Sequence, residues 1–272
     1  MKAVPGTAGQ LEALVGDRLD RSPLAVMLDI DGTLAPIAAT PENAFVPLET
    51  SEVVRKLAQV PGVHLALVSG RAVDDARKLL DVEGAWIIGN HGLEIRTPEG
   101  ELSAVPEAHA FEATIAEANK ALALLSRETR GALVENKRWT LTLHFRLSDE
   151  RMVPTLVAAA HEIAREHGLD SRLGKKVIEL RPPVAINKGT ATLALAGRVG
   201  ALGSGSVLYA GDDQTDEDAF LVLRKAMRDA VTIHVLGPRD DQSAATTEAE
   251  YSLASTDELR RTLEWVLARR TG

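Results

Sequence analysis

The sequence has 272 residues, of which 45% are hydrophobic, enough for one large domain or two smaller ones. A formal net charge of −8 argues against general nucleic-acid binding, which usually needs a basic surface. The absence of Cys excludes disulfides and thiolate metal sites, and no apolar run approaches the roughly 20 residues of a membrane-spanning helix. We therefore expect a soluble, cytoplasmic protein that is a monomer and binds neither nucleic acid nor membranes.

Residues 1–22 are expected to form a short helix and a linker. After them, short apolar runs that suit buried strands alternate with helical patterns, which is typical of a doubly wound parallel α/β sheet. The predicted strands cover residues 24–29, 65–68, 86–88, 207–210 and 233–236. The predicted helices cover residues 51–59, 73–80, 189–199, 217–228 and 256–269.

The pattern changes over residues 105–182, where helices and strands no longer alternate singly. The expected elements are a helix, two strands, a second helix and two short strands, at residues 107–127, 132–136, 139–146, 149–167, 172–173 and 176–181. This αββαββ order predicts a small α+β domain with one open sheet face. We expect it to be inserted into a larger α/β core made of residues 23–104 and 183–272.

Polar side chains follow three of the predicted core strands. Asp29 and Asp31 lie two residues apart at one strand end, Ser69 follows a second strand, and Asp212 and Asp213 follow a third. Because ligands bind beyond the carboxyl ends of strands in such sheets, we expect these side chains in one crevice. A single acid after a strand is often only a loop or helix-cap residue. Five polar groups at three strand ends instead favour a functional site.

The crowded acids of this crevice indicate a metal site. Two unit charges 4 Å apart repel by about 1 kcal/mol in water, and by more in a crevice. A hard divalent cation would relieve the repulsion, and carboxylate oxygens with retained waters suit Mg²⁺.

The same residue types suit hydrolysis of a phosphate ester. One Asp can attack phosphorus to form an aspartyl-phosphate, while a second protonates the leaving oxygen and then activates a water. Ser69 can donate a hydrogen bond to a phosphoryl oxygen, and Lys188, near a helix start, can offset the phosphate charge.

Four motifs resemble those of the haloacid dehalogenase-like (HAD) phosphatase superfamily: Asp29-Ile-Asp31-Gly-Thr33-Leu, Ser69-Gly-Arg71, Lys188-Gly and Gly211-Asp-Asp213-Gln-Thr-Asp216-Glu-Asp218. Further stretches are similar to the trehalose-6-phosphate phosphatase family: Gly211 to Phe220, Asn90-His91-Gly92, Val134-Glu135-Asn-Lys137 and Glu179-Leu-Arg181-Pro182. The resemblance extends over roughly residues 24–267.

The resemblance implies a HAD-like core with a cap domain, and a Mg²⁺-dependent hydrolase of trehalose biosynthesis that cleaves trehalose 6-phosphate to trehalose and phosphate. It implies that Asp29 is the nucleophile and Asp31 the general acid and base, with Ser69 and Lys188 holding the phosphoryl group. The implied Mg²⁺ ligands are Asp29, the backbone carbonyl of Asp31, Asp212 and, nearby, Asp213. Asp216 is expected to support the metal site.

The cap is expected to select the sugar and to close over the site. The resemblance implies that these residues bind substrate: Arg71, Asn90, His91, Glu135, Lys137, Arg146 and Glu179. From the strand pattern alone, polar residues on an open sheet face are usually only solvated. For His91, the alternative to substrate binding is a structural role.

Three alternatives remain from the sequence. Another HAD sugar phosphatase, acting on sucrose phosphate or mannosylglycerate phosphate, would use the same catalytic residues. A phospho-Asp receiver domain also carries acids, a Ser or Thr and a Lys at strand ends. The second acid Asp31, the inserted domain and the chain length oppose the receiver. A catalytically silent sugar-binding protein is opposed by the complete set of expected catalytic residue types.

Overall fold

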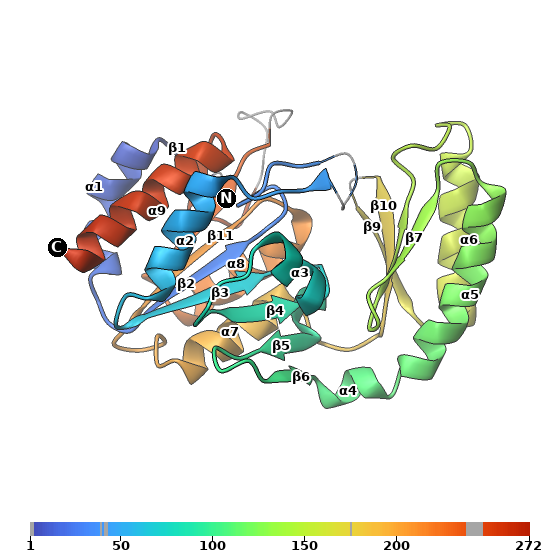
Figure 1. The fold of residues 1–272 in the computed structure, drawn as a ribbon, viewed down its shortest axis with the longest axis horizontal. Coiled ribbons are helices and arrows are strands. Elements are labelled where there is room, and N and C mark those ends of the chain that lie inside the picture. Colours follow the sequence, from blue (N-terminus) through green and yellow to red (C-terminus); the bar gives the residue numbers. More distant parts are fainter. Residues whose placement is uncertain (1–2, 39, 41–42, 175, 238–246) are drawn as a thin grey trace. The chain divides into compact units, whose positions relative to one another are not determined.

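Figure 1 shows the computed structural model of the chain, which describes residues 3–38, 40, 43–174, 176–237 and 247–272. The chain divides into two compact units. The first contains Met1–Ser103 and Ile186–Gly272, and the second contains Ala104–Ala185. The predicted insert, residues 105–182, lies within the second unit.

A mixed sheet forms the centre of the first unit, with nine strands among the described residues, in the order β1-β13-β12-β11-β2-β3-β4-β5-β6. The strands from β1 through β4 in this order are parallel to their neighbours, whereas β5 is antiparallel to β4. The bounds are β1 Val4–Gly6, β2 Leu24–Asp29, β3 Val63–Val68, β4 Trp86–Gly89, β5 Glu94–Arg96, β6 Leu102–Ala104, β11 Ser206–Gly211, β12 Val231–Val235 and β13 Tyr251–Leu253.

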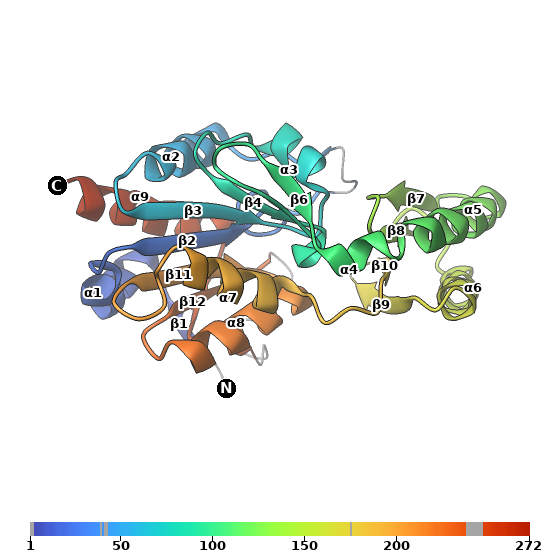
Figure 2. The same ribbon diagram turned by 90° about the horizontal axis from the view of Figure 1, so that it is seen from below.

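Helices cover both faces of this sheet (Figure 2). Their bounds are α1 Ala8–Leu19, α2 Leu48–Ala58, α3 Val73–Leu79, α7 Lys188–Arg198, α8 Gln214–Ala226 and α9 Thr256–Thr271. The central strand β2 is apolar almost throughout because both of its faces are covered by helices. Val26 and Leu28 pack with residues of α1, α2 and α9, whereas Ala25 and Met27 pack with residues of α7 and α8. Every residue of β2 is therefore buried, as a two-sided sheet requires.

The chain order reverses beside β2, because β3 pairs with one of its edges and β11 with the other. The registers align Asp29 with Val68 and Leu28 with Ala210, so these three strands end at the same level. The loops after β2, β3 and β11 therefore begin side by side. This reversal is the position at which open α/β sheets bind ligands.

The second unit contains an antiparallel sheet in the order β7-β8-β10-β9 and the helices α4, α5 and α6. Their bounds are α4 Pro106–His109, α5 Glu112–Glu128, β7 Leu133–Asn136, β8 Leu141–His144, α6 Val153–Glu166, β9 Asp170–Gly174 and β10 Val177–Arg181. Leu141 and Leu143 of β8 pack with residues of α5 and α6. Thr142, between them, shares the opposite face with its register partners Glu135 and Glu179.

Four short strands were not predicted: β1, β5, β6 and β13. Each has three residues, too few to establish an alternating pattern, and Val4-Pro5-Gly6 contains two residues that are unfavourable in strands. β1 thus lies in the segment predicted as helix and linker, of which residues 1–2 are outside the described part. The helix predicted over 107–127 is divided into α4 and α5. Among the described residues, no helix combines the length and the hydropathy required to cross a membrane.

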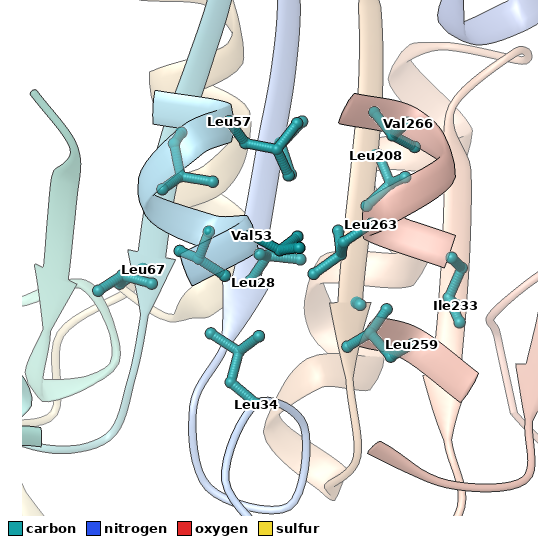
Figure 3. Packing of buried hydrophobic residues seen from close by; sticks show 14 of the residues in the cluster. Leu28, Leu34, Val53, Leu57, Leu67, Leu208, Ile233, Leu259, Leu263 and Val266 are labelled. Carbon is teal, nitrogen blue, oxygen red and sulfur yellow. The ribbon is translucent and has the colours of Figure 1, made fainter. Parts of the chain in front are cut away.

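The core packing in Figure 3 generates a stability prediction for helix α2. Leu57 is fully buried at 0% exposure, whereas Leu48 of the same helix is 67% exposed. We expect Leu57→Ala to lower the free energy of unfolding by about 2–5 kcal/mol, because it removes buried contacts and leaves a cavity. Leu48→Ala is the matched control and should change it by less than about 0.5 kcal/mol. Urea denaturation measures both, and equal losses would contradict this packing.

Candidate active site

Asp29 is the last residue of β2 and lies deep in the first unit, with only 3% of its surface exposed. The loop that follows it turns at Gly32, where φ is +90°. A Cβ atom built on Gly32 would lie 2.2 Å from Oδ2 of Asp212, which is closer than atoms approach. Glycine at this position therefore allows the loop after β2 to lie against the acid that follows β11.

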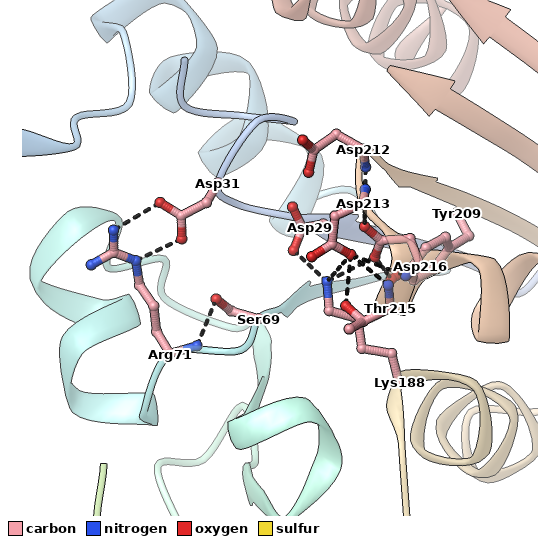
Figure 4. A network of polar contacts seen from close by, with 10 residues as sticks. All are labelled: Asp29, Asp31, Ser69, Arg71, Lys188, Tyr209, Asp212, Asp213, Thr215 and Asp216. Carbon is pink, nitrogen blue, oxygen red and sulfur yellow. Dashed lines mark hydrogen bonds and ion pairs between the residues drawn. The ribbon is translucent and has the colours of Figure 1, made fainter. Parts of the chain in front are cut away.

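A buried ammonium group joins Asp29 to Asp216 (Figure 4). Lys188 is the first residue of α7, whose N-cap is Asn187, and it is 2% exposed. Its Nζ donates to Oδ1 of Asp29 and to Oδ1 of Asp216, at 2.8 Å in each case. Asp213 Oδ1 lies 3.8 Å from the same nitrogen. Such pairing is what allows a charged lysine to remain in the interior.

Asp216 accepts hydrogen bonds from three further groups. The Tyr209 hydroxyl donates to Oδ1 at 2.6 Å, and the backbone N–H groups of Asp212 and Asp213 each donate to Oδ2 at 3.0 Å. These bonds fix Asp216 against both the strand β11 and the start of α8. Sequence reasoning missed Tyr209, although a hydroxyl inside an apolar strand is a signal, because a buried polar group needs a partner.

Burial and charge act in opposite directions on these groups. Burial raises the pKa of Asp29 well above its usual value, although the Lys188 ammonium opposes the rise. Burial also raises the pKa of Asp216 against the same opposition. For Lys188, burial lowers the pKa, but the surrounding carboxylates outweigh it and raise the pKa well above its usual value. The lysine therefore stays charged, and its charge offsets only part of the cost of burying Asp29 and Asp216.

Three carboxylates have the spacing of a metal site, although both oxygens of Asp216 already accept hydrogen bonds. Asp29, Asp212 and Asp216 each offer an oxygen atom, and these atoms lie within 4.8 Å of one another. Oδ2 of Asp29 is buried and has no hydrogen-bond partner among the described residues. A buried, unpartnered carboxylate oxygen beside two further acids fits a hard, oxygen-preferring ion such as Mg²⁺.

Asp213, predicted as a metal residue, caps helix α8. Its Oδ1 accepts hydrogen bonds from the backbone N–H and the hydroxyl of Thr215, at 2.8 and 2.7 Å. Burial would raise the pKa of Asp213, but Lys188 and these hydrogen bonds outweigh it and hold the pKa below its usual range. Among the described carboxylates, the group spaced for a metal contains Asp216 rather than Asp213.

Asp31, Ser69 and Arg71 meet in a second set of contacts (Figure 4). The Arg71 guanidinium donates to both carboxylate oxygens of Asp31, from Nε at 2.6 Å and from Nη2 at 2.7 Å. The Arg71 backbone N–H donates to the Ser69 hydroxyl at 3.1 Å. Arg71, predicted to bind substrate, is thus in contact with the predicted general acid.

Asn90 and His91 follow β4 in a tight turn, with φ angles of 48° and 55°. Asn90 is fully buried, and its side-chain amide donates to Oε1 of Glu94 at 2.8 Å. His91 is 8% exposed. Sequence reasoning also missed Glu94, because an isolated acid in a short segment is normally solvated.

The remaining predicted substrate residues belong to the second unit. Glu135 and His144 lie 2.8 Å apart, measured from Oε2 to Nε2. Lys137 and Glu179 lie 3.7 Å apart, measured from Nζ to Oε1. Arg146 follows β8 and is exposed. A Glu–His contact and a Lys–Glu ion pair therefore line the sheet face opposite the helices of this unit.

Known proteins resemble the chain over most of its length. A profile described as trehalose-phosphatase matches residues 27–257. Trehalose-phosphate phosphatase B of Arabidopsis thaliana is 33% identical over 255 residues, covering 89% of this chain and 65% of that protein. An uncharacterized glycosyl hydrolase of Mycobacterium tuberculosis is 40% identical over 205 residues, covering 74% of this chain and 15% of that protein. A crystal structure of a trehalose-6-phosphate phosphatase related protein has a TM-score of 0.76 at 27% identity, covering 90% of this chain and 97% of that one.

The fold is that of the HAD-like phosphatases, and the predicted fold class is confirmed. Within this class, the chain belongs to the trehalose-phosphatase family, as the motifs predicted. The chain spans 65% of the Arabidopsis relative and 15% of the mycobacterial one.

The contacts of Asp216 generate a prediction about stability. Tyr209→Phe keeps the ring but removes the hydroxyl that donates to this buried carboxylate, so we expect unfolding to need about 1.5–3 kcal/mol less free energy. Tyr251→Phe is the comparison, because its hydroxyl accepts from Arg18 in a part-buried contact, whereas the contact between Tyr209 and Asp216 is buried. Tyr251→Phe should lower the free energy of unfolding by less than about 1 kcal/mol. Chemical denaturation measures both variants, and a larger loss for Tyr251→Phe than for Tyr209→Phe would contradict the network.

Proposed function

We propose that the chain is a Mg²⁺-dependent phosphatase that hydrolyses trehalose 6-phosphate to trehalose and phosphate through an aspartyl-phosphate at Asp29. Membership of the trehalose-phosphatase family supports the substrate. The observation that carries the chemistry is the position of Asp29, whose Oδ1 is held by Lys188 and whose Oδ2 has no hydrogen-bond partner in the described part of the chain. A fixed carboxylate with an available oxygen suits nucleophilic attack.

The first step transfers the phosphoryl group to the protein. A carboxylate oxygen of Asp29 attacks phosphorus, and the bond between phosphorus and the sugar oxygen breaks. Asp31 donates a proton to that oxygen, so the sugar leaves as a neutral alcohol. The Lys188 ammonium and the Ser69 hydroxyl stabilise the phosphoryl oxygens. Mg²⁺, held by Asp29, Asp212 and the Asp31 carbonyl and supported by Asp216, would add positive charge beside the same oxygens.

The second step restores the enzyme. Asp31, now ionised, removes a proton from water, and the resulting hydroxide attacks phosphorus. The bond between phosphorus and the Asp29 oxygen breaks, which releases phosphate and regenerates both aspartates. One acid thus serves in both directions because its proton is given up in the first step and recovered in the second.

We assign choice of the sugar to the polar sheet face of the second unit, which acts as the cap. The contacts that support this assignment are the Glu135–His144 and Lys137–Glu179 pairs, which present charged donors and acceptors on one face. Arg146, Arg71 and His91 complete the proposed set of sugar-binding residues. Asn90 is assigned to the support of the loop instead, because its side chain is buried and bonded to Glu94.

The main experiment measures phosphate release from a panel of sugar phosphates with and without Mg²⁺. We expect trehalose 6-phosphate to be hydrolysed fastest, ahead of sucrose phosphate and mannosylglycerate phosphate, and all rates to fall on chelation. Asp29→Asn should abolish turnover at unchanged folding, because an amide does not replace the nucleophile. Faster hydrolysis of another sugar phosphate would overturn the substrate, and substantial activity in Asp29→Asn would overturn the mechanism.

A second prediction concerns the cap. Glu135→Ala and Lys137→Ala should reduce kcat/KM for trehalose 6-phosphate by about 10-fold or more, because each removes charged contacts to the sugar, as such hydrogen bonds contribute 1.5–3 kcal/mol. The same variants should change kcat/KM for p-nitrophenyl phosphate by less than about threefold. Arg151→Ala, at an 88% exposed side chain of the same unit, is the control. Equal losses on both esters would contradict the assignment.

A further inference from the structure

A buried carboxylate outside the motifs, Glu94 at the start of β5, connects two segments near the site. Glu94 is 7% exposed, and its Oε1 accepts two hydrogen bonds. One comes from the backbone N–H of Val73, the first residue of α3, at 2.7 Å, and the other from Nδ2 of Asn90 at 2.8 Å. Glu94 therefore ties the start of α3 to the turn after β4.

The loop Ser69–Arg71 lies between these two segments and is bonded to the turn. The Asn90 N–H donates to the Arg71 carbonyl at 2.7 Å, and the His91 N–H donates to the Ser69 carbonyl at 3.0 Å. Both turn residues have positive φ, which costs free energy for residues other than glycine and persists only where surrounding contacts enforce it. The two bonds of Glu94 are among the contacts that enforce it.

Close packing leaves this loop little room to move. A Cβ built on Gly70 would lie 2.5 Å from the His91 ring. A Cβ built on Gly89 would lie 2.8 Å from the Val73 nitrogen and 3.0 Å from the Arg71 carbonyl oxygen. The backbone of Arg71 is thus held by hydrogen bonds and by contact at the same time.

The side chain of Arg71 carries this fixed position to Asp31. Its guanidinium forms a two-point contact with the Asp31 carboxylate, which sets the orientation of the carboxylate plane as well as its distance. The Asp31 side chain itself is 42% exposed, so burial alone does not hold it. Displacement of Arg71 would therefore displace Asp31.

We propose that Glu94 is a positioning residue for the general acid, acting through Asn90 and Arg71 on Asp31. This inference rests on the proposed function, in which Asp31 protonates the leaving oxygen. In this scheme Glu94 acts on Asp31 and takes no part in nucleophilic attack or in phosphoryl binding. Its loss should weaken proton donation to the leaving group more than phosphoryl binding.

Two aryl esters without any sugar provide the test. Phenyl phosphate has a poor leaving group that needs a proton, whereas p-nitrophenyl phosphate releases a stable anion that needs little assistance. The ratio kcat/KM reports only the steps up to the first irreversible one, which here is phosphoryl transfer to Asp29. It therefore isolates the role of Asp31 as an acid from its later role as a base.

Glu94→Ala should lower kcat/KM for phenyl phosphate by about 10- to 100-fold, a range typical of small displacements and of lost supporting contacts. For p-nitrophenyl phosphate the loss should be less than about threefold. Glu94→Gln should stay within about threefold of wild type on both esters, because its amide oxygen can still accept both N–H groups. Glu101→Ala, at an exposed acid between β5 and β6, is the matched control.

Asp31→Asn serves as the reference and should show the same dependence on the leaving group. If Asp31→Asn shows it and Glu94→Ala does not, the inference fails while the proposed function stands. If Asp31→Asn loses equally on both esters, the acid role of Asp31 fails and the inference falls with it. A Glu94→Gln enzyme as impaired as Glu94→Ala would also overturn the inference.

If Glu94→Ala does not fold, a second variant, Asn90→Gly, tests the same contact. Glycine suits the positive φ at this position and removes the side-chain amide that donates to Glu94. We expect it to reproduce the selective loss on phenyl phosphate, with circular dichroism unchanged. A folded Asn90→Gly enzyme with wild-type activity on both esters would overturn the proposal.

Discussion

The buried ammonium of Lys188 is the interaction on which the site depends. Without it, Asp29 and Asp216 would be carboxylates in the interior with no positive partner, a situation that proteins avoid because of its desolvation cost. The lysine in turn depends on α7, whose first residue it is, and on the capping of that helix by Asn187. The charge balance of the site therefore depends on the sheet order that places the acids together and on the start of α7 that places Lys188 beside them.

One lysine does not neutralise its surroundings. Asp29, Asp212, Asp213 and Asp216 all lie within a few ångströms of one another or of Lys188. Arg71 is already paired with Asp31. The excess of negative charge explains why a cation belongs to the proposed mechanism. Burial raises the pKa of Asp29, and the neighbouring acids Asp212, Asp213 and Asp216 add to the rise.

The sequence allowed the central strands and their polar ends to be predicted because both follow from short-range patterns. β2, β3 and β11 are apolar runs with polar termini, and one topological rule places Asp29 and Asp212 together. The hydrogen-bond partners of the site residues could not be predicted from short-range patterns. Glu94 and Tyr209 acquire their roles from contacts with Val73 and Asp216, which lie outside their own strands and therefore outside the local strand pattern. The resemblance implied a place for Asp213 near the metal, and the structure adds that its side chain caps helix α8.

The pairing of β2 with β11 has a consequence for the order of assembly on the ribosome. β2 ends at Asp29 and β11 begins at Ser206, so one edge of the central strand has no partner until most of the chain has been synthesised. The second unit, by contrast, is a continuous segment with its own hydrophobic cluster and is complete before β11 emerges. An open apolar strand edge invites pairing with other nascent chains, so protection of β2 during translation becomes a demand on the cell's chaperones.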